Sequence, residues 1–249
     1  MAGLPLHDLA LALCILLGAL LYSSVGHAGA SAYIALMALF GVPAATMRPT
    51  ALSLNIVVAT LASFRFLRAG LFRWRVLWPF LITAVPASFI GGMIRIPPET
   101  YRPMVGIVLL LSAARMVWPQ SDKPAVEPRD PPVPLGMAIG TVIGLLSGMT
   151  GTGGGIFLSP VLLLANWAPI KTTSGVVAVF ILANSAAGLL GNVSAMQHLP
   201  AQLPLFAGAA LVGGLIGTSL GIRLQSRVIT RLLAMVLVIA GTKMLGLYG

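Results

Sequence analysis

Two glycine-rich stretches carry the chemistry that this sequence offers. Residues 26–31 read GHAGAS and residues 151–155 read GTGGG, and each stands between long apolar runs. If a helix begins directly after each stretch, its first backbone N–H groups have no partner within the helix, and its dipole presents a positive end. Glycine has no side chain that would keep an anion away from those N–H groups. Two such helix starts predict a binding site for a small anion.

Polar residues accompany both stretches, with His27 and Thr152 at equivalent positions. Each polar residue or glycine also has a structural interpretation, because glycine lets membrane helices pack closely and a polar side chain can simply bond a neighbouring helix. The occurrence of a break in both halves of the chain favours binding. We expect the substrate to contact Gly26, His27, Gly29, Ser31, Asn55, Gly151, Thr152, Gly153, Gly154, Gly155, Asn184 and Ser185.

The acidic residues bear on the sign of the substrate's charge. The chain has only five, namely Asp8, Glu99, Asp122, Glu127 and Asp130, and none lies in the middle of an apolar run. Cation carriers and most proton-coupled pumps need carboxylates inside the membrane. An anion held by N–H groups, hydroxyls and amides is therefore the favoured substrate.

Other chemistries find little support in the residues. GTGGG lacks the preceding strand and the later acidic residue of a dinucleotide-binding fingerprint. The single cysteine, Cys14, cannot form an internal disulfide or build a metal site. A serine hydrolase built from Ser23 or Ser147 with His27 is the weak alternative. The sequence predicts no enzymatic activity, no cofactor and no metal site.

The elements that position these residues must lie in a membrane. Of the 249 residues, 58% are hydrophobic and only 8% are charged, whereas a soluble domain has roughly 25% charged residues. Apolar runs of spanning length recur along the chain. The net charge of +10 comes mostly from short loops between those runs, which fits membrane topology rather than a nucleic-acid partner. We predict an all-α integral membrane protein whose partners are the lipid bilayer and a small anion.

The chain repeats itself at an offset near 126 residues. Residues 26–43 resemble residues 151–169, and residues 88–94 resemble residues 214–220, so a duplication is expected. We predict an N-terminal membrane repeat at 1–118, a Pro-rich charged linker at 119–134 and a C-terminal membrane repeat at 135–249. The apolar segments are Leu4–Val25, Ala30–Phe40, Thr50–Leu67, Leu77–Ile94, Met104–Trp118, Leu135–Met149, Ile156–Trp167, Val176–Val193, Pro204–Leu224 and Val228–Leu247.

The arginines predict that the two repeats are inverted. Residues 65–75, the linker and residues 223–231 are rich in Arg or Lys, whereas residues 192–204 have neither. If the basic regions are cytoplasmic, each half crosses the membrane an odd number of times and both termini lie outside. Each half then holds a glycine-broken pair of short helices and three membrane helices, about eight to ten segments in all. Arg95 and Arg102 fall outside in this arrangement.

Several motifs together resemble the sulfite exporter TauE/SafE family, also called the four-toluene sulfonate uptake permease family. They are SSVGHAGAS at 23–31, SGMTGTGGGIFLSP at 147–160, the following GVP and WAP, and HLP at 198–200. The resemblance covers about residues 8–247 and is strong in the second half. The first half departs from it, with His27 and Ala28 where glycine-rich members have small residues.

The resemblance implies transport of small sulfur-containing anions across the bacterial inner membrane, for example sulfite, sulfoacetate, sulfolactate or aromatic sulfonates. An anion that leaves an inside-negative cell gains about 2.3 kcal/mol per charge per 100 mV. Export needs no coupling ion, so we expect export. The alternatives are an ion-coupled importer of an anion and a non-transporting membrane subunit or assembly factor. The sequence does not predict an oligomeric state.

Overall fold

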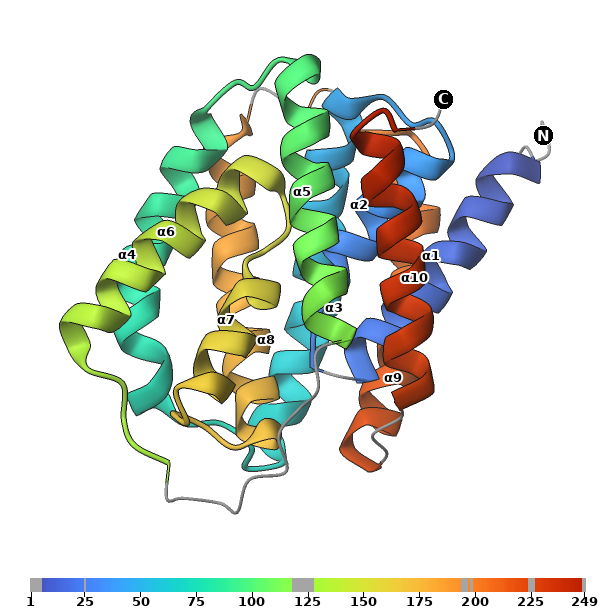
Figure 1. Ribbon diagram of the computed structural model, residues 1–249. Helices are drawn as coiled ribbons and strands as arrows, with labels where there is room; N and C mark the ends of the chain where they lie inside the picture. The colour runs from blue at the N-terminus through green and yellow to red at the C-terminus, as the bar shows by residue number, and fades with distance from the viewer. Residues whose placement is uncertain are drawn as a thin grey trace.

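The protein is a bundle of α-helices in a computed structural model that describes residues 6–24, 26–117, 128–193, 197, 199–223 and 227–247 (Figure 1). These residues form helices and no strand, which confirms the predicted all-α class. The helices are α1 (Leu6–Ser24), α2 (Ala30–Leu39), α3 (Ala44–Arg68), α4 (Trp74–Met93), α5 (Pro98–Val117), α6 (Val133–Thr150), α7 (Gly155–Leu164), α8 (Ile170–Gly191), α9 (Leu203–Arg223) and α10 (Arg227–Met244).

Six helices are long and apolar enough to cross a membrane by length and composition. They are α1, α3, α4, α6, α8 and residues Leu203–Leu220 of α9. Helices α5 and α10 have 20 and 18 residues, with three charged residues in each. Helices α2 and α7 have only 10 residues each, about 15 Å of helix, or half of the hydrocarbon thickness. The chain is thus a multi-pass membrane protein with two short helices.

The short helices begin where the glycine stretches predicted. The residue before α2 is Gly29, with φ of 108°, and the residue before α7 is Gly154, with φ of 78°. Both values lie in the left-handed region, which side chains other than glycine rarely adopt. Each glycine lets the chain reverse out of the preceding long helix and start a new one.

The start of the third helix differs from the prediction in both halves. The apolar segments began at Thr50 and Val176, but α3 begins at Ala44 and α8 at Ile170. Polar residues and Pro49 were interpreted as loop. A proline this close to a helix start removes one hydrogen bond and is tolerated by tertiary packing. The first turns of α3 and α8 therefore belong to the helices.

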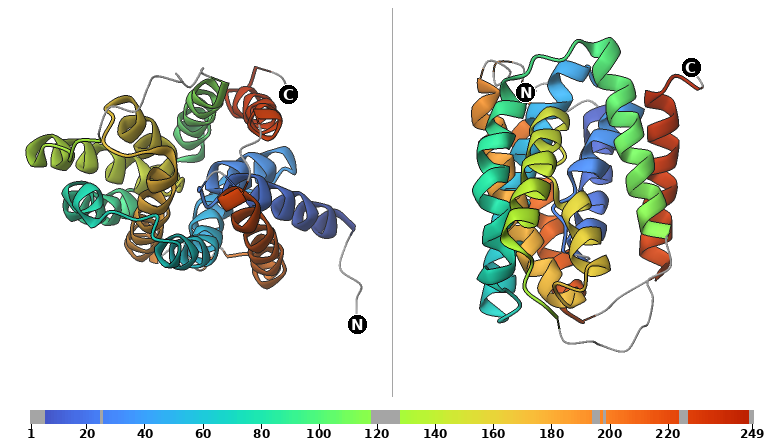
Figure 2. Two further views of the ribbon diagram at one scale, coloured as in Figure 1. Left: turned by 90° about the horizontal axis from the view of Figure 1, so that it is seen from below. Right: turned by 60° about the vertical axis from the view of Figure 1, so that its left-hand side comes forward.

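Contacts between helices follow the repeat. In the first half α1 to α5 correspond to α6 to α10 of the second. Helix α1 packs on α9 as α6 packs on α4, α3 packs on α9 as α8 packs on α4, and α2 packs on α10 as α7 packs on α5. Helices α3 and α8 contact each other, as do α5 and α10. The pairs α4–α6 and α5–α10 lie side by side in every view (Figures 1 and 2). Exchange of the halves maps each of these pairs onto another of them or, for α3–α8 and α5–α10, onto itself, which supports the predicted duplication.

The two equivalent helices α3 and α8 run antiparallel. A Cβ built at Gly188, late in α8, would lie 3.7 Å from Leu52, early in α3, whereas one at Gly175 would lie 3.3 Å from Phe66, late in α3. Counterpart helices are antiparallel in an inverted repeat and parallel in a repeat about the membrane normal. The pairing supports the inverted repeat, which stays a prediction.

Glycines bring α6 close to α4. Cβ atoms built at Gly140, Gly144 and Gly148, which recur every four residues along α6, would overlap backbone carbonyl oxygens of α4. Small residues at this spacing allow membrane helices to approach backbone to backbone. Helix α6, which ends at the second glycine break, is in this way anchored on α4.

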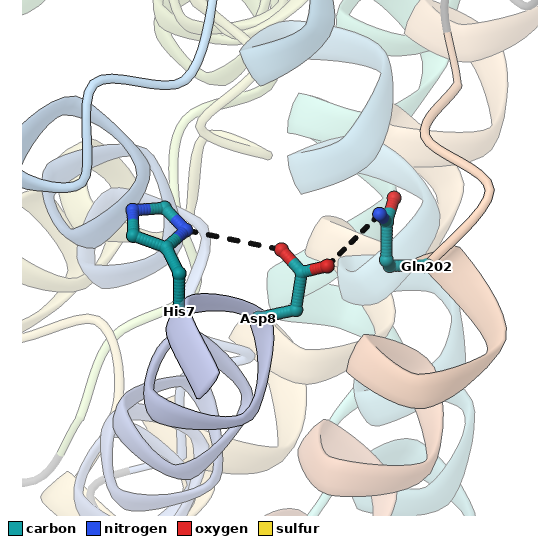
Figure 3. Close-up of polar contacts among 3 residues, drawn as sticks. All are labelled: His7, Asp8 and Gln202. Carbon is teal, nitrogen blue, oxygen red and sulfur yellow. Dashed lines mark hydrogen bonds and ion pairs between the residues drawn. The ribbon is translucent and has the colours of Figure 1, made fainter. Parts of the chain in front are cut away.

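One end of the bundle gathers the start of α1 and the end of α10 (Figure 1). Here Gln202, just before α9, donates a hydrogen bond of 3.0 Å to Asp8 in the first turn of α1, and His7 lies 3.8 Å from the other carboxylate oxygen (Figure 3). Lys243 near the end of α10 donates to the carbonyl of Leu39 at the end of α2.

The opposite end gathers basic residues. Arg73, before α4, forms an ion pair of 3.1 Å with Asp130 of the linker. The backbone N–H of Arg129 donates to the carbonyl of Asn166, after α7. The arginine-rich loop and the described end of the linker thus share one end, as the charge pattern predicted. Lys123 lies outside the described residues, and the cytoplasmic location of this end stays a prediction.

Candidate functional site

The second glycine break packs directly onto α3 and α8. A Cβ at Gly153 would overlap the side-chain amide of Asn55 and would lie 2.9 Å from the Ser185 hydroxyl. A Cβ at Gly155 would overlap Ile181. Side chains are excluded here by lack of space, so the backbone of the break is the surface that meets the two central helices.

Predicted site residues from both halves meet at this break. The Asn55 amide nitrogen donates to the Ser185 hydroxyl at 3.2 Å and to the carbonyl of Thr152 at 3.5 Å. The hydroxyls of Thr150 and Thr152 lie 2.9 Å apart. Asn55 and Ser185 have no exposed surface. The structure therefore brings one residue of the first half and several of the second into one polar cluster where α3 crosses α8.

Asn184 makes its hydrogen bonds elsewhere. Its side-chain nitrogen donates to the carbonyl of Phe180, one turn earlier in α8, and its own backbone carbonyl accepts from Ser88 of α4. Its side-chain oxygen is buried without a hydrogen-bond partner. These contacts tie Asn184 to α4 and α8 rather than to a glycine break.

Each break is held by the third helix of the other half. A Cβ at Gly26 would overlap Ser174 of α8, and a Cβ at Gly151 would lie 3.1 Å from the side chain of Arg48 in α3. Positions 48 and 174 differ by 126 residues, which is the repeat offset. The two contacts are thus equivalent, and neither break could be packed in this way within its own half.

The first break is filled by tyrosines that the sequence did not single out. The Tyr33 hydroxyl donates to the carbonyl of Ala28 at 2.6 Å, and its ring lies against Gly29. The Ser31 hydroxyl donates to the Tyr22 hydroxyl at 2.9 Å. Both tyrosines are buried. An aromatic residue in an apolar run gives no signal that it will face a glycine loop.

His27 joins the first break to the second half. Its Nε2 atom lies 3.0 Å from the hydroxyl of Ser159, one turn after the start of α7. The imidazole is half-buried. The first break therefore lies beside α7, whose N-terminus forms the second break.

Arg48, just before the predicted apolar segment Thr50–Leu67, was not among the residues expected to contact the substrate. It is 6% exposed and is the one charged side chain counted as buried among the described residues. Its guanidinium donates to the carbonyls of Gly91, Gly92 and Ile94, at the end of α4. The two terminal nitrogens of the guanidinium are bonded to these carbonyls, as suits the C-terminus of a helix, whereas its buried Nε has no partner. The side-chain stem of Arg48 lies against Gly151, and its desolvated positive charge lies at the end of α4.

An apolar pocket of about 550 Å³ lies between α5, α6 and α7. Ser112 is the one polar residue that lines the pocket. The pocket reaches the first turn of α7 at Ile156. The predicted site residues do not line it. The glycines of both breaks are buried in packed contacts instead.

A bundle with membrane-length apolar helices, interrupted by two buried glycine breaks, defines the class of multi-pass membrane transporters with broken helices. The chain belongs to the sulfite exporter TauE/SafE family, whose model matches residues 11–244, which confirms the resemblance.

A relative from Sinorhizobium fredii (strain NBRC 101917 / NGR234), named probable membrane transporter protein y4hK, is 40% identical over 239 residues, covering 94% of this chain and 97% of the relative. No solved structure matches the chain. Family and relative together identify a membrane transporter, and they support the predicted bacterial inner membrane location.

Proposed function

We propose that the protein transports small sulfur-containing anions, such as sulfite, sulfoacetate or other sulfonates, and that the anion binds where the glycine-broken helices begin. The observation that carries this proposal is the polar cluster at the α3–α8 crossing, where Asn55 and Ser185 contact the backbone of the second break. The cluster lies between the two halves, next to the unpaired N–H groups at the start of α7.

The charge of the interior favours an anion. Among the described residues, the acidic side chains are Asp8 and Glu99, each in the first turn of its helix, and Asp130 in the linker. Arg48, whose stem lies against Gly151, adds a buried positive charge at the end of α4. A cation would find no carboxylate in these helix interiors, whereas an anion meets donors and a positive field.

The direction that we propose is export. A negative interior potential drives an anion outward by about 2.3 kcal/mol per charge per 100 mV. No cation site is visible among the described interior side chains, so a coupled importer has less support than uncoupled efflux.

Flux of labelled sulfite or methanesulfonate from proteoliposomes tests the proposal. With protein present, an imposed inside-negative potential is expected to accelerate efflux, and protein-free liposomes of the same lipid give the baseline. Flux that ignores the potential, or that strictly needs a sodium or proton gradient, contradicts uncoupled export. Absence of flux for every sulfur-containing anion contradicts the transport of this substrate class.

A further inference from the structure

We infer that each chain holds a single anion site, at the second glycine break, with Ser147 as a direct ligand, and that tyrosines of the first half occupy the equivalent place at the first break. The inference rests on the proposed transport function. It adds the number of sites, their location and one binding residue.

The repeat places Tyr22 and Ser147 at equivalent positions. The glycines that precede the short helices, Gly29 and Gly154, are 125 residues apart, and so are Tyr22 and Ser147. Each of the two residues lies in the last two turns of the long helix before its break. A direct comparison of their surroundings is therefore valid.

At the start of α2 the tyrosine hydroxyls are already hydrogen-bonded within the protein. Tyr22 is 1% exposed, and its hydroxyl accepts a hydrogen bond from Ser31 in the first turn of α2. The Tyr33 hydroxyl donates to the carbonyl of Ala28, and its ring covers Gly29. The start of α2 is therefore occupied by the protein's own side chains.

At the second break a hydroxyl has no partner. Ser147 has no exposed surface, and its hydroxyl makes no hydrogen bond in the described structure. Its Cβ atom lies 3.4 Å from a Cβ built at Gly154, the residue directly before α7. An unpaired buried hydroxyl is destabilising, and it would gain a strong hydrogen bond from an anion at this helix start. Ser147 thus supplies a donor where its counterpart Tyr22 closes the space.

The charged residues, like the tyrosine and serine hydroxyls, differ between the two breaks. At the second break the stem of Arg48 lies against Gly151 and carries a buried guanidinium to the end of α4, while the equivalent position beside Gly26 is held by Ser174, which carries no charge. The second break therefore combines a free hydroxyl, a helix N-terminus and a nearby cation. The buried Ser23 hydroxyl near the first break also has no partner, but it lies against α9, 3.6 Å from a Cβ built at Gly214. The start of α2 itself is covered by the two tyrosines.

Calorimetry with sodium sulfite and sodium methanesulfonate on the full-length protein in detergent, together with the concentration dependence of flux, tests the inference. We expect one anion bound per chain. Ser147→Ala is expected to weaken binding, and to raise KM, about tenfold through loss of one hydrogen bond to a charged group. Its unfolding temperature should not fall, because the removed hydroxyl has no partner. Ser147→Tyr, which copies the first half, should abolish binding.

Tyr22→Phe is the matched control, since it removes a hydroxyl at the equivalent position that is already bonded within the protein. It is expected to lower the unfolding temperature and to leave the binding constant unchanged. Two anions per chain, or wild-type binding and KM in Ser147→Ala, would overturn the inference while wild-type flux keeps the transport function intact. If the wild-type protein shows neither flux nor binding, the proposed function fails and the inference falls with it.

Discussion

Arg48 sets the electrostatic character of the second break. Its side-chain stem lies against Gly151, and its guanidinium donates hydrogen bonds to carbonyls at the end of α4. A buried charge of this kind is costly unless its hydrogen bonds are satisfied. The residue therefore links the folding of α4 to the field that an anion meets.

We predict that Arg48→Gln lowers both stability and transport. The substitution removes the charge and leaves buried carbonyls unpaired, at a cost of about 1–3 kcal/mol for each unsatisfied group. Flux in proteoliposomes should fall roughly tenfold or more, and thermal unfolding should shift downward. Arg48→Lys keeps the charge and should recover part of the flux.

Arg68→Gln, at an exposed position of the same helix where the guanidinium stacks over Phe64, is the control and should transport normally. Equal flux for Arg48→Gln and Arg68→Gln would show that the buried charge has no role in transport.

Three of the residues predicted from the sequence to bind substrate lie together in the structure. Asn55, Thr152 and Ser185 were chosen as polar residues in apolar surroundings, and the structure joins them in one cluster. Arg48 was missed because its role depends on which carbonyls fold over it. Tyr22 was missed because no local pattern in the sequence shows that a tyrosine side chain will occupy the space at the start of a helix. Whether any of these residues binds substrate stays a prediction.

The elements of the fold were easier to predict than their contacts. The apolar runs and glycine breaks predict the ten described helices and their order along the chain. They can do so because the length of a membrane span and the backbone conformation of glycine are local properties. The starts of α3 and α8 were placed six residues late, since Pro49 and the polar residues near Ser174 mimic a loop. The pairing of α4 with α6 depends on glycine faces that meet only in three dimensions.

We predict that Gly144→Leu separates α6 from α4 and displaces the second break. A Cβ at this position overlaps a carbonyl oxygen of Ala84, and overpacking of this kind costs about 1–3 kcal/mol or more. The unfolding temperature should drop by roughly 5–10 °C, with loss of flux.

Gly208→Leu in α9 is the matched control, because nothing lies within 4 Å of its Cβ position. It should behave as the wild type. An unfolding temperature for Gly144→Leu as high as that of the control would contradict the close α4–α6 packing.

The whole molecule has two distinct ends, and their orientation in the membrane can be measured. The start of α1 and residue 202 share one end, and the arginine-rich loop and residue 130 share the other. The excess of basic residues predicts that the second end is cytoplasmic.

We predict that a cysteine replacing Ala201 reacts with a membrane-impermeant maleimide in intact cells, and that one replacing Asp130 reacts only after permeabilisation. Cys14 is the only native cysteine, so a Cys14→Ala background gives a clean label. Asp130 pairs with Arg73 at the surface, and the loss of an exposed pair costs little. The reverse labelling pattern would overturn the predicted orientation, and labelling of both positions in intact cells would overturn the inverted repeat.

Each glycine break rests on the third helix of the opposite half. This exchange of contacts has a consequence for the origin of the chain. Two copies of a half-length ancestor, inserted in opposite orientations, would make the same contacts as a dual-topology homodimer. Such an ancestor must insert both ways in equal numbers, and its two sites must stay identical. Fusion through the linker lifts both constraints, and leaves one break free to specialise while the other becomes scaffold.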